Sequence, residues 1–382
     1  MSKKVIQNRA ATFELEPDGF SIHTIELACK MSCAAWMRLK QSLYEQSGPG
    51  EIYKIKGCER YHYSGYSAYG ITITLECCPH SAGAARYLIG MVINPRKLID
   101  PNSSYLGILP PHKKTVEKLE RAFHQLFKQT GIPDDINAYQ LRRADLCTNI
   151  RCDNKKIFRE TVRVLRKLPT PPKYTRKYSG KKNKKEAREM DRHYILFTCG
   201  AKELVLYDKV YQVEKGGLEA GGDKLPQGVL RVELHCRRDS IRKLERAWDE
   251  TETTMLIWSL IQESEARLTA QFSRCFSDAA FCQMDEIINI VHASPYKKQT
   301  QQAMCELATA LQRKQSVDTA LAAIQKDGYA TEGILDRFAA LGISPIPLWK
   351  SFCAKRIPGP VELLRTVSNG SVSVPYIKVK RK

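Results

Sequence analysis

Three short apolar segments of this chain each carry one side chain that could take part in phosphoryl transfer. They are residues 141–146 with Asp145, residues 204–209 with Tyr207, and residues 230–234 with Glu233. Their length and aliphatic content are typical of β-strands. A tyrosine hydroxyl and two carboxylates on neighbouring strands predict a site in which the tyrosine attacks a phosphodiester while a metal ion supports the reaction.

Side chains alternate between the two faces of a strand, so their parity indicates which of them share a face. If the three segments are neighbours in a sheet, one face displays Asp145, Tyr207, Lys209, Glu233 and His235. Oxygen-rich groups of this kind suit Mg²⁺ or Mn²⁺. We therefore predict Asp145, Glu233 and His235 as metal ligands, and Mg²⁺ or Mn²⁺ as the cofactor.

Tyr207 is the predicted nucleophile. A free tyrosine is a poor nucleophile because its pKa is about 10, but a cation such as Lys209 or the metal would make the phenolate more accessible. Attack on phosphorus would leave a phosphotyrosine bond that a DNA hydroxyl can reverse, whereas plain hydrolysis needs no tyrosine. The alternative is structural: a tyrosine packed in a strand, with Asp145 and Glu233 in ion pairs with neighbouring arginines.

The formal net charge of +20 predicts nucleic acid as the main partner. No run of about 18 apolar residues occurs, so we expect no membrane span. Residues 1–5 lack the apolar core of a signal peptide, and a cytoplasmic protein is expected. The 13 cysteines are odd in number and irregularly spaced, which favours free thiols over a disulfide framework.

A proline-initiated, strongly basic segment at about 168–192 predicts a mobile loop. Its cations suit phosphate contacts, and its tyrosines suit stacking on the bases of single-stranded DNA. The predicted DNA-binding residues are Arg143, Lys173, Tyr174, Arg176, Lys177, Lys181, Lys182, Lys184 and Lys185. A solvated linker without a specific role is the alternative.

The pattern of apolar residues predicts an α+β protein in three parts. They are an α+β nicking and religating domain at 1–247, a helical C-terminal region at 248–350, and an extended basic tail at 351–382. Helices are expected at 32–45, 115–130 and 153–167, and repeatedly after residue 250. The last five residues are expected to be disordered.

The order and spacing of three motifs resemble the replication initiation factor family, the rolling-circle initiators (Rep_trans type) of Gram-positive plasmids, filamentous phages and integrative elements. The motifs are Leu141-Arg142-Arg143-Ala144-Asp145-Leu146, Leu206-Tyr207-Asp208-Lys209 and Leu230-Arg231-Val232-Glu233-Leu234. The resemblance covers roughly residues 135–245 and implies an antiparallel-sheet catalytic domain. The segment at 168–192 is longer than the usual connection, and no His-x-His pair occurs, so the chain does not resemble the HUH branch of such initiators.

The resemblance implies a site-specific relaxase, an endonuclease that nicks and religates origin DNA through a 5′-phosphotyrosine. Tyr207 would be the nucleophile, and Lys209 and Arg231 would bind phosphate or support the site. The implied partners are origin DNA (a hairpin and the single-stranded nick region), a second copy of the chain and a host helicase, with no membrane. The alternative is a non-catalytic DNA-binding protein of a plasmid or phage, acting in copy control, partition or regulation.

Overall fold

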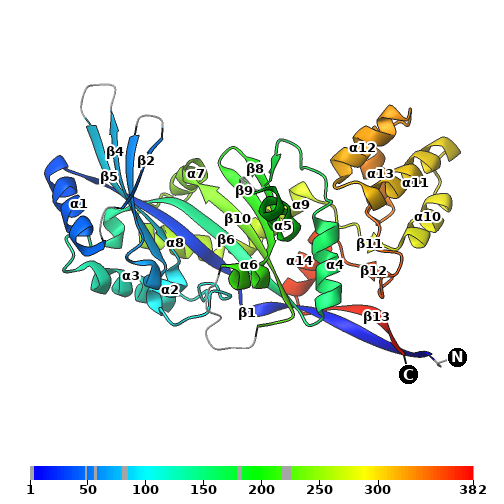
Figure 1. Cartoon of the computed structure of the whole chain (residues 1–382), viewed down its shortest axis with the longest axis horizontal. Coiled ribbons are helices and arrows are strands. Elements are labelled where there is room, and N and C mark those ends of the chain that lie inside the picture. The colour runs from blue at the N-terminus through cyan, green and yellow to red at the C-terminus, as the bar shows by residue number, and fades with distance from the viewer. Residues whose placement is uncertain are drawn as a thin grey trace.

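The computed structural model describes residues 4–47, 50–55, 58–79, 85–178, 183–216 and 225–381. Within these residues an 11-stranded antiparallel sheet forms the centre of the molecule (Figure 1). Its strands are β1 (Lys4–Met31), β2 (Glu51–Ile55), β3 (Cys58–Tyr63), β4 (Ile71–Pro79), β5 (Ala85–Ile93), β6 (Gln140–Cys152), β7 (Thr175–Lys177), β8 (Tyr194–Cys199), β9 (Lys202–Asp208), β10 (Gly228–Arg237) and β13 (Val372–Arg381). The spatial order is β2-β3-β4-β5-β1-β6-β10-β9-β8-β7, and β13 pairs with β1.

Helices cover the sheet and make up most of the chain after β10. They are α1 (Cys33–Ser47), α2 (Pro95–Ile99), α3 (Lys113–Phe127), α4 (Lys155–Leu165), α5 (Lys184–His193), α6 (Lys209–Lys215), α7 (Arg238–Trp248), α8 (Thr253–Gln262), α9 (Ser264–Cys275), α10 (Met284–His292), α11 (Lys298–Arg313), α12 (Val317–Lys326), α13 (Ile334–Ala340) and α14 (Pro360–Ser368). The α+β class, the antiparallel sheet and the mostly helical C-terminal region confirm the sequence prediction at that level. The finer division at residue 247 stays a prediction.

The three segments with candidate chemistry are adjacent strands. β10 lies between β6 and β9 in the sheet. The register sets Asp145 opposite His235 and Tyr207 opposite Arg231. Because paired strands align their faces, side chains of matching parity come together on one face of the sheet.

The other face of these strands carries the hydrophobic core. Ala144, Leu146 and Ile150 of β6 belong to one buried cluster with Leu260 of α8 and Phe272 of α9. Asp145, which has the opposite parity, points away from this cluster. The division into an apolar face and a polar face therefore follows directly from the alternation in the sequence.

Helix α4 approaches β10 closely at Gly228. A Cβ atom at this position would lie 2.2 Å from Cγ of Phe158, well inside van der Waals contact. Only glycine fits there without displacing the Phe158 ring. The side chain of Asn154 caps the start of α4 by accepting hydrogen bonds from the backbone N–H groups of Lys156 and Ile157.

The prediction of an extended tail at 351–382 is wrong. This segment contains a short strand β12 (Arg356–Ile357), which pairs with β11 (Phe281–Cys282), then α14, and then β13. β13 pairs along the first part of β1, from Lys4↔Arg381 to Phe13↔Val372 (Figure 1). The reason is the alternation of Val372, Val374 and Tyr376, of which Val374 is buried and the other two pack partly against the core. Lys382 lies outside the described residues.

Part of the segment 168–192, which was predicted to be a mobile loop, has regular secondary structure. Residues 175–177 form the edge strand β7, which pairs with β8, and α5 begins at Lys184. The side chain of Asn183 caps α5 by accepting from the backbone N–H groups of Lys185 and Glu186. Lys181 and Lys182 lie outside the described residues.

Two further expectations concern thiols and membranes. Cys58 and Cys78 form a disulfide between β3 and β4, and the other cysteines are free thiols. The expectation of free thiols is therefore wrong for one pair and right for the other 11 cysteines. Within the described part of the chain, no helix has the length and apolar character needed to cross a bilayer.

Candidate active site

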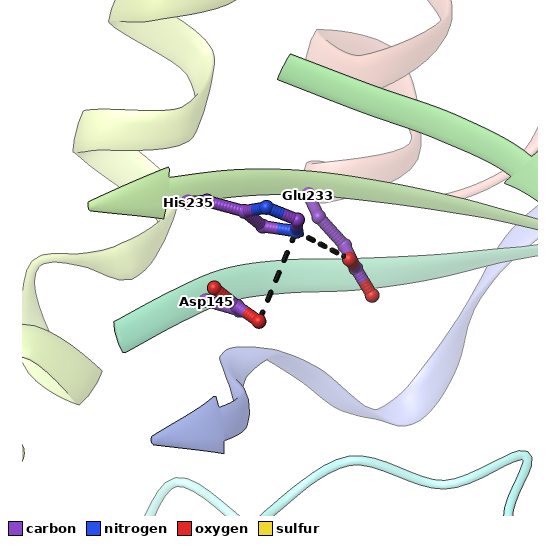
Figure 2. A group of neighbouring side chains, drawn as sticks. All are labelled: Asp145, Glu233 and His235. Atoms are coloured by element: carbon purple, nitrogen blue, oxygen red, sulfur yellow. Dashed lines mark hydrogen bonds and ion pairs between the residues drawn. The ribbon is translucent and has the colours of Figure 1, made fainter. Parts of the chain in front are cut away.

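Asp145, Glu233 and His235 meet on the polar face of the central strands (Figure 2). β6 supplies Asp145, and β10 supplies the other two side chains, which project from the same face two residues apart. Nε2 of His235 lies 2.9 Å from Oε2 of Glu233 and 3.8 Å from Oδ2 of Asp145. All three side chains are buried, and one ligand atom from each lies within 4.8 Å of the others. Two carboxylates and an imidazole at this separation fit a divalent cation.

A second layer of polar side chains orients this group. Arg143 donates from Nε and Nη2 to the two carboxylate oxygens of Asp145, each at 2.6 Å. Nδ1 of His235 lies 2.9 Å from Oε2 of Glu203, and Glu203 accepts from Arg237 at 2.5 Å. Such contacts hold a ligating imidazole and carboxylate in fixed orientations.

Burial and neighbouring charges set the protonation of the group. Burial alone would lower the pKa of His235, but its hydrogen bonds with Glu203 and Glu233 raise it to about 9. Burial would raise the pKa of Glu233, yet the hydrogen bond from His235 and the charge of Arg231 hold it well below its usual range. Burial raises the pKa of Asp145 to about 6 against the opposing effect of His235. In the metal-free protein His235 is therefore protonated near neutral pH.

Tyr207 joins the group through its hydroxyl. Its Oη donates to Oε1 of Glu233 at 2.7 Å, from the neighbouring strand β9. The side chain is only 4% exposed. Burial and the negative charge of Glu233 raise the pKa of Tyr207 well above its ordinary value, so the resting side chain is a neutral phenol.

Lys209 is not on the strand, contrary to the parity argument. The strand ends at Asp208, whose side chain caps α6 by accepting from the backbone N–H of Tyr211, and Lys209 is the first residue of that helix. Its Nζ donates to Gln212 at 2.7 Å and lies 5.8 Å from the centre of the Tyr207 ring. Burial and the charge of Arg231 lower the pKa of Lys209 well below its ordinary value. Lys209 is thus near the phenol but does not promote its ionisation in this arrangement.

Arg231 is fully buried beneath the site. Its Nε donates to Asn149 Oδ1 at 2.7 Å, and its Nη2 donates to the carbonyls of Leu106 and Gly107 at 2.5 and 3.2 Å. These contacts tie the loop after α2 to β6 and β10. The described structure therefore gives Arg231 a positioning role under Tyr207, while its predicted contact with phosphate stays a prediction.

His23 is a member of the site that the sequence argument missed. The pairing of β1 with β6 shifts between Ile22 and Thr24, and this irregularity turns His23 toward the polar face. Its Nδ1 lies 2.8 Å from Thr24 Oγ1 and 3.9 Å from Glu233 Oε1. Burial, then the charge of Arg231, lower its pKa well below the usual value, so the imidazole is neutral. Ile22 and Ile25 are both apolar but lie three residues apart, so the alternation of apolar residues changes from even to odd positions between them. This change in the sequence is the signal for the bulge.

The predicted DNA-binding residues differ in their exposure and in their contacts. Lys173, Lys177 and Lys185 are exposed, as phosphate contacts require. Arg143 is committed to Asp145. The Tyr174 hydroxyl accepts from Gln271 of α9 at 3.0 Å, and its ring packs partly against the core. Arg176 lies half-buried beside α4, and the backbone of Lys184 starts α5. Tyr174 is therefore a packing residue in this conformation rather than an exposed stacking surface.

Comparison with protein-family models found no matching family, and no curated protein matches the chain. The similarity of the three motifs to rolling-circle initiators therefore stays a prediction from the residues themselves. What the structure adds is the geometry: two carboxylates, an imidazole and a phenol from three adjacent strands in one buried group.

Proposed function

We propose that this chain is a nickase and religase that initiates rolling-circle replication of DNA. The observation that supports it most directly is the 2.7 Å hydrogen bond from the Tyr207 hydroxyl to Glu233, a member of the group with Asp145 and His235. A phenol held against a carboxylate inside a cation-binding group is the arrangement that tyrosine-dependent phosphoryl transfer needs. Hydrolysis by activated water would leave the buried phenol without a chemical role.

The proposed reaction is a reversible transfer of one phosphodiester. The Tyr207 oxygen attacks phosphorus, and Glu233 Oε1 is the group positioned to take the phenol proton. The bond from phosphorus to the 3′ oxygen breaks, that oxygen leaves as a 3′-hydroxyl after taking up a proton, and the 5′-phosphate stays on Tyr207. Attack by a 3′-hydroxyl in the reverse direction restores the DNA and frees Tyr207.

Asp145, Glu233 and His235 are the residues that would hold the cofactor. Mg²⁺ or Mn²⁺ in this group would polarise the scissile phosphate and, through its charge, favour the phenolate of Tyr207. Arg143 would keep Asp145 oriented, and Glu203 would keep the His235 ring in place. We further propose origin DNA, a second copy of the chain and a host helicase as partners, in the cytoplasm where the DNA of such an element lies.

A nicking assay tests this proposal. Supercoiled DNA that carries the origin of the chain's own genetic element is incubated with the protein and Mg²⁺ or Mn²⁺, and covalent adducts are mapped by peptide sequencing. We expect an adduct on Tyr207, and Tyr207→Phe is expected to abolish both adduct and nick while DNA binding persists. An adduct on Tyr174, Tyr194 or Tyr211 would overturn the assignment of Tyr207 and leave the proposed activity intact.

The burial of Tyr207 favours a second candidate, a non-catalytic DNA-binding protein. A phenol that is 4% exposed and hydrogen-bonded to a carboxylate also suits a purely structural role. In that case wild-type protein forms no adduct with any origin-bearing supercoil, and Tyr207→Phe changes stability without changing a DNA reaction.

A further inference from the structure

A strongly basic cavity of about 420 Å³ lies between the sheet and the helical C-terminal region. Its cations come from four parts of the chain: the end of α4, β7, α5 and the connection from α11 to α12. Tyr194 of β8 and Trp349 add aromatic rings to the lining. Nine of its fifteen lining residues are lysine or arginine, and among the described residues Asp191 is the one acidic side chain in the lining. Representative cations from the four parts are Arg166, Arg176, Arg188 and Arg313. A concentration of like charge on this scale requires an explanation beyond solubility.

The walls of the cavity are held in place partly by hydrogen bonds from its cations to backbone carbonyls, whereas Arg163 and Arg192 are ion-paired with Glu160 and Glu189. Arg176 donates to the carbonyls of Arg166 and Leu168, and Lys167 donates to the carbonyl of Leu311. The backbone N–H of Val317 donates to the Lys167 carbonyl at 2.9 Å. Carbonyl acceptors orient a cation but leave its charge in place. The connection from α11 to α12 is thereby fixed to the end of α4, and the cavity is preformed.

Packing these cations together costs free energy that a bound anion would offset. Burial, then the charge of Arg176, lower the pKa of Arg166. Burial, then the charge of Arg163, lower the pKa of Lys167 to about 8. Nε of Arg166 is buried and has no hydrogen-bond partner among the described residues. These are the properties of a site whose charges are completed by a ligand.

Two exposed aromatic rings lie at the cavity. Trp349 is 59% exposed, and the guanidinium of Arg163 lies 5.1 Å from the centre of its ring. Tyr178 is 61% exposed, with the Arg176 guanidinium 5.5 Å from its ring centre. Exposed aromatic faces beside arginines are the surfaces on which unpaired bases stack. A ligand that carries only phosphate would make no use of them.

Tyr194 connects the cavity to the candidate active site. It lines the cavity, and it pairs with Tyr207 across β8 and β9, with the two ring centres 5.7 Å apart. A strand whose phosphates lie on the cavity cations would therefore continue toward the phenol of Tyr207.

We propose that this cavity binds single-stranded DNA, with phosphates on its cations and bases stacked on Trp349 and Tyr178. Arg313 and Lys314 would give the helical C-terminal region a direct part in binding the strand. The inference rests on the proposed nicking function in taking the ligand to be the DNA strand that is cut at Tyr207.

The test measures binding without chemistry. Full-length Tyr207→Phe protein in EDTA is titrated against a labelled single-stranded oligonucleotide of about 16 nucleotides, long enough to span one binding groove. The double variant Arg313→Ala/Lys314→Ala removes two exposed cations at the C-terminal end of α11. Its control, Lys297→Ala/Lys298→Ala, removes two exposed lysines at the other end of the same helix. Thermal unfolding verifies that both variants fold.

The salt dependence of binding gives the decisive number. Each phosphate contact to a single strand contributes about 0.7 to the slope of log affinity against log salt. We expect Arg313→Ala/Lys314→Ala to reduce the slope by about 1.4, while the control leaves it unchanged. Trp349→Ala is expected to weaken binding about tenfold, and Trp349→Phe is expected to recover most of it because phenylalanine also stacks.

Two results would contradict the inference. An unchanged slope in Arg313→Ala/Lys314→Ala excludes the cavity as the binding site. Tighter binding of matched duplex DNA, or of RNA with the same sequence, overturns the assigned ligand.

The adduct assay with wild-type protein separates the two proposals. If wild-type protein forms an adduct on Tyr207 and the cavity variants bind the oligonucleotide normally, the nicking function is retained and the cavity is rejected as the binding site. Weakened binding in the cavity variants without any adduct rejects nicking but retains a single-strand site.

Discussion

Nδ1 of His235 lies 2.9 Å from Glu203 Oε2, on the opposite edge of the ring from the 2.9 Å contact between Nε2 and Glu233. Both ring nitrogens therefore face a carboxylate oxygen, and both carry protons in the metal-free protein. The proton on Nε2 occupies the side of the ring that a cation would need. Metal binding and proton binding compete at this atom.

The affinity for Mn²⁺ is expected to rise with pH up to about 9, the pKa of His235. Below that pKa a cation must displace the Nε2 proton, so affinity falls by up to about tenfold for each pH unit. Titration calorimetry in buffers of different ionisation enthalpy should show release of about one proton near pH 7. An affinity that is flat from about pH 7 to pH 9 would exclude His235 as a ligand.

Metal-free protein is expected to lose stability as pH rises toward 9. The folded-state pKa of His235, about 9, exceeds its unfolded value, so the stabilisation is complete below the unfolded pKa of about 6.5 and is lost through pH 9. We expect the free energy of unfolding in EDTA to fall by about 3 kcal/mol across this window. Urea denaturation at several pH values measures it. In His235→Gln protein this pH dependence should be absent, and its persistence would assign it to another group.

Tyr207→Phe is expected to destabilise the folded protein by about 2 kcal/mol. The substitution keeps the ring but removes the hydrogen bond to the charged Glu233 carboxylate, and such bonds contribute about 1.5–3 kcal/mol. Urea denaturation is the measurement, and Tyr194→Phe on the neighbouring strand is a control. A neutral effect of Tyr207→Phe would mean that the hydroxyl and Glu233 are not bonded in solution.

Val374→Asp is expected to destabilise the protein by about 3 kcal/mol, because an unpaired carboxylate would replace a buried aliphatic side chain in β13. Ser373→Asp adds the same charge at the neighbouring exposed position and should change stability by less than about 0.5 kcal/mol. Thermal and urea unfolding compare the two. Equal effects of the two substitutions would mean that β13 does not pack against the body of the protein.

Strand parity was enough to predict the grouping of Asp145, Glu233 and Tyr207, because a period of two fixes the face of each side chain once the strands are neighbours. His23 was missed because a bulge interrupts that period. Parity alone extends the strand to Lys209, whereas Asp208 caps α6, and an aspartate before an amphipathic segment is a readable helix start.

Other features lay beyond local patterns altogether. Local pattern does not separate β13 from a tail, because Lys378, Lys380 and Arg381 make its end strongly basic, and Val374 is buried where β13 pairs with β1. The basic cavity joins Arg166 to Arg313, and no local rule relates positions so far apart along the chain. Contacts of this kind follow from topology, which propensity and periodicity do not specify.

The pairing of β1 with β13 has a consequence for the order in which the protein forms. Residues 4–11 have their strand partners in residues 374–381, so that ladder closes a loop of nearly the whole chain. Closing so long a loop is slow compared with forming the β6–β10 ladder. During synthesis the sheet would assemble around the site first, leaving the outer edge of β1 open until the last strand emerges. That open edge is the surface on which premature association between growing chains is to be expected.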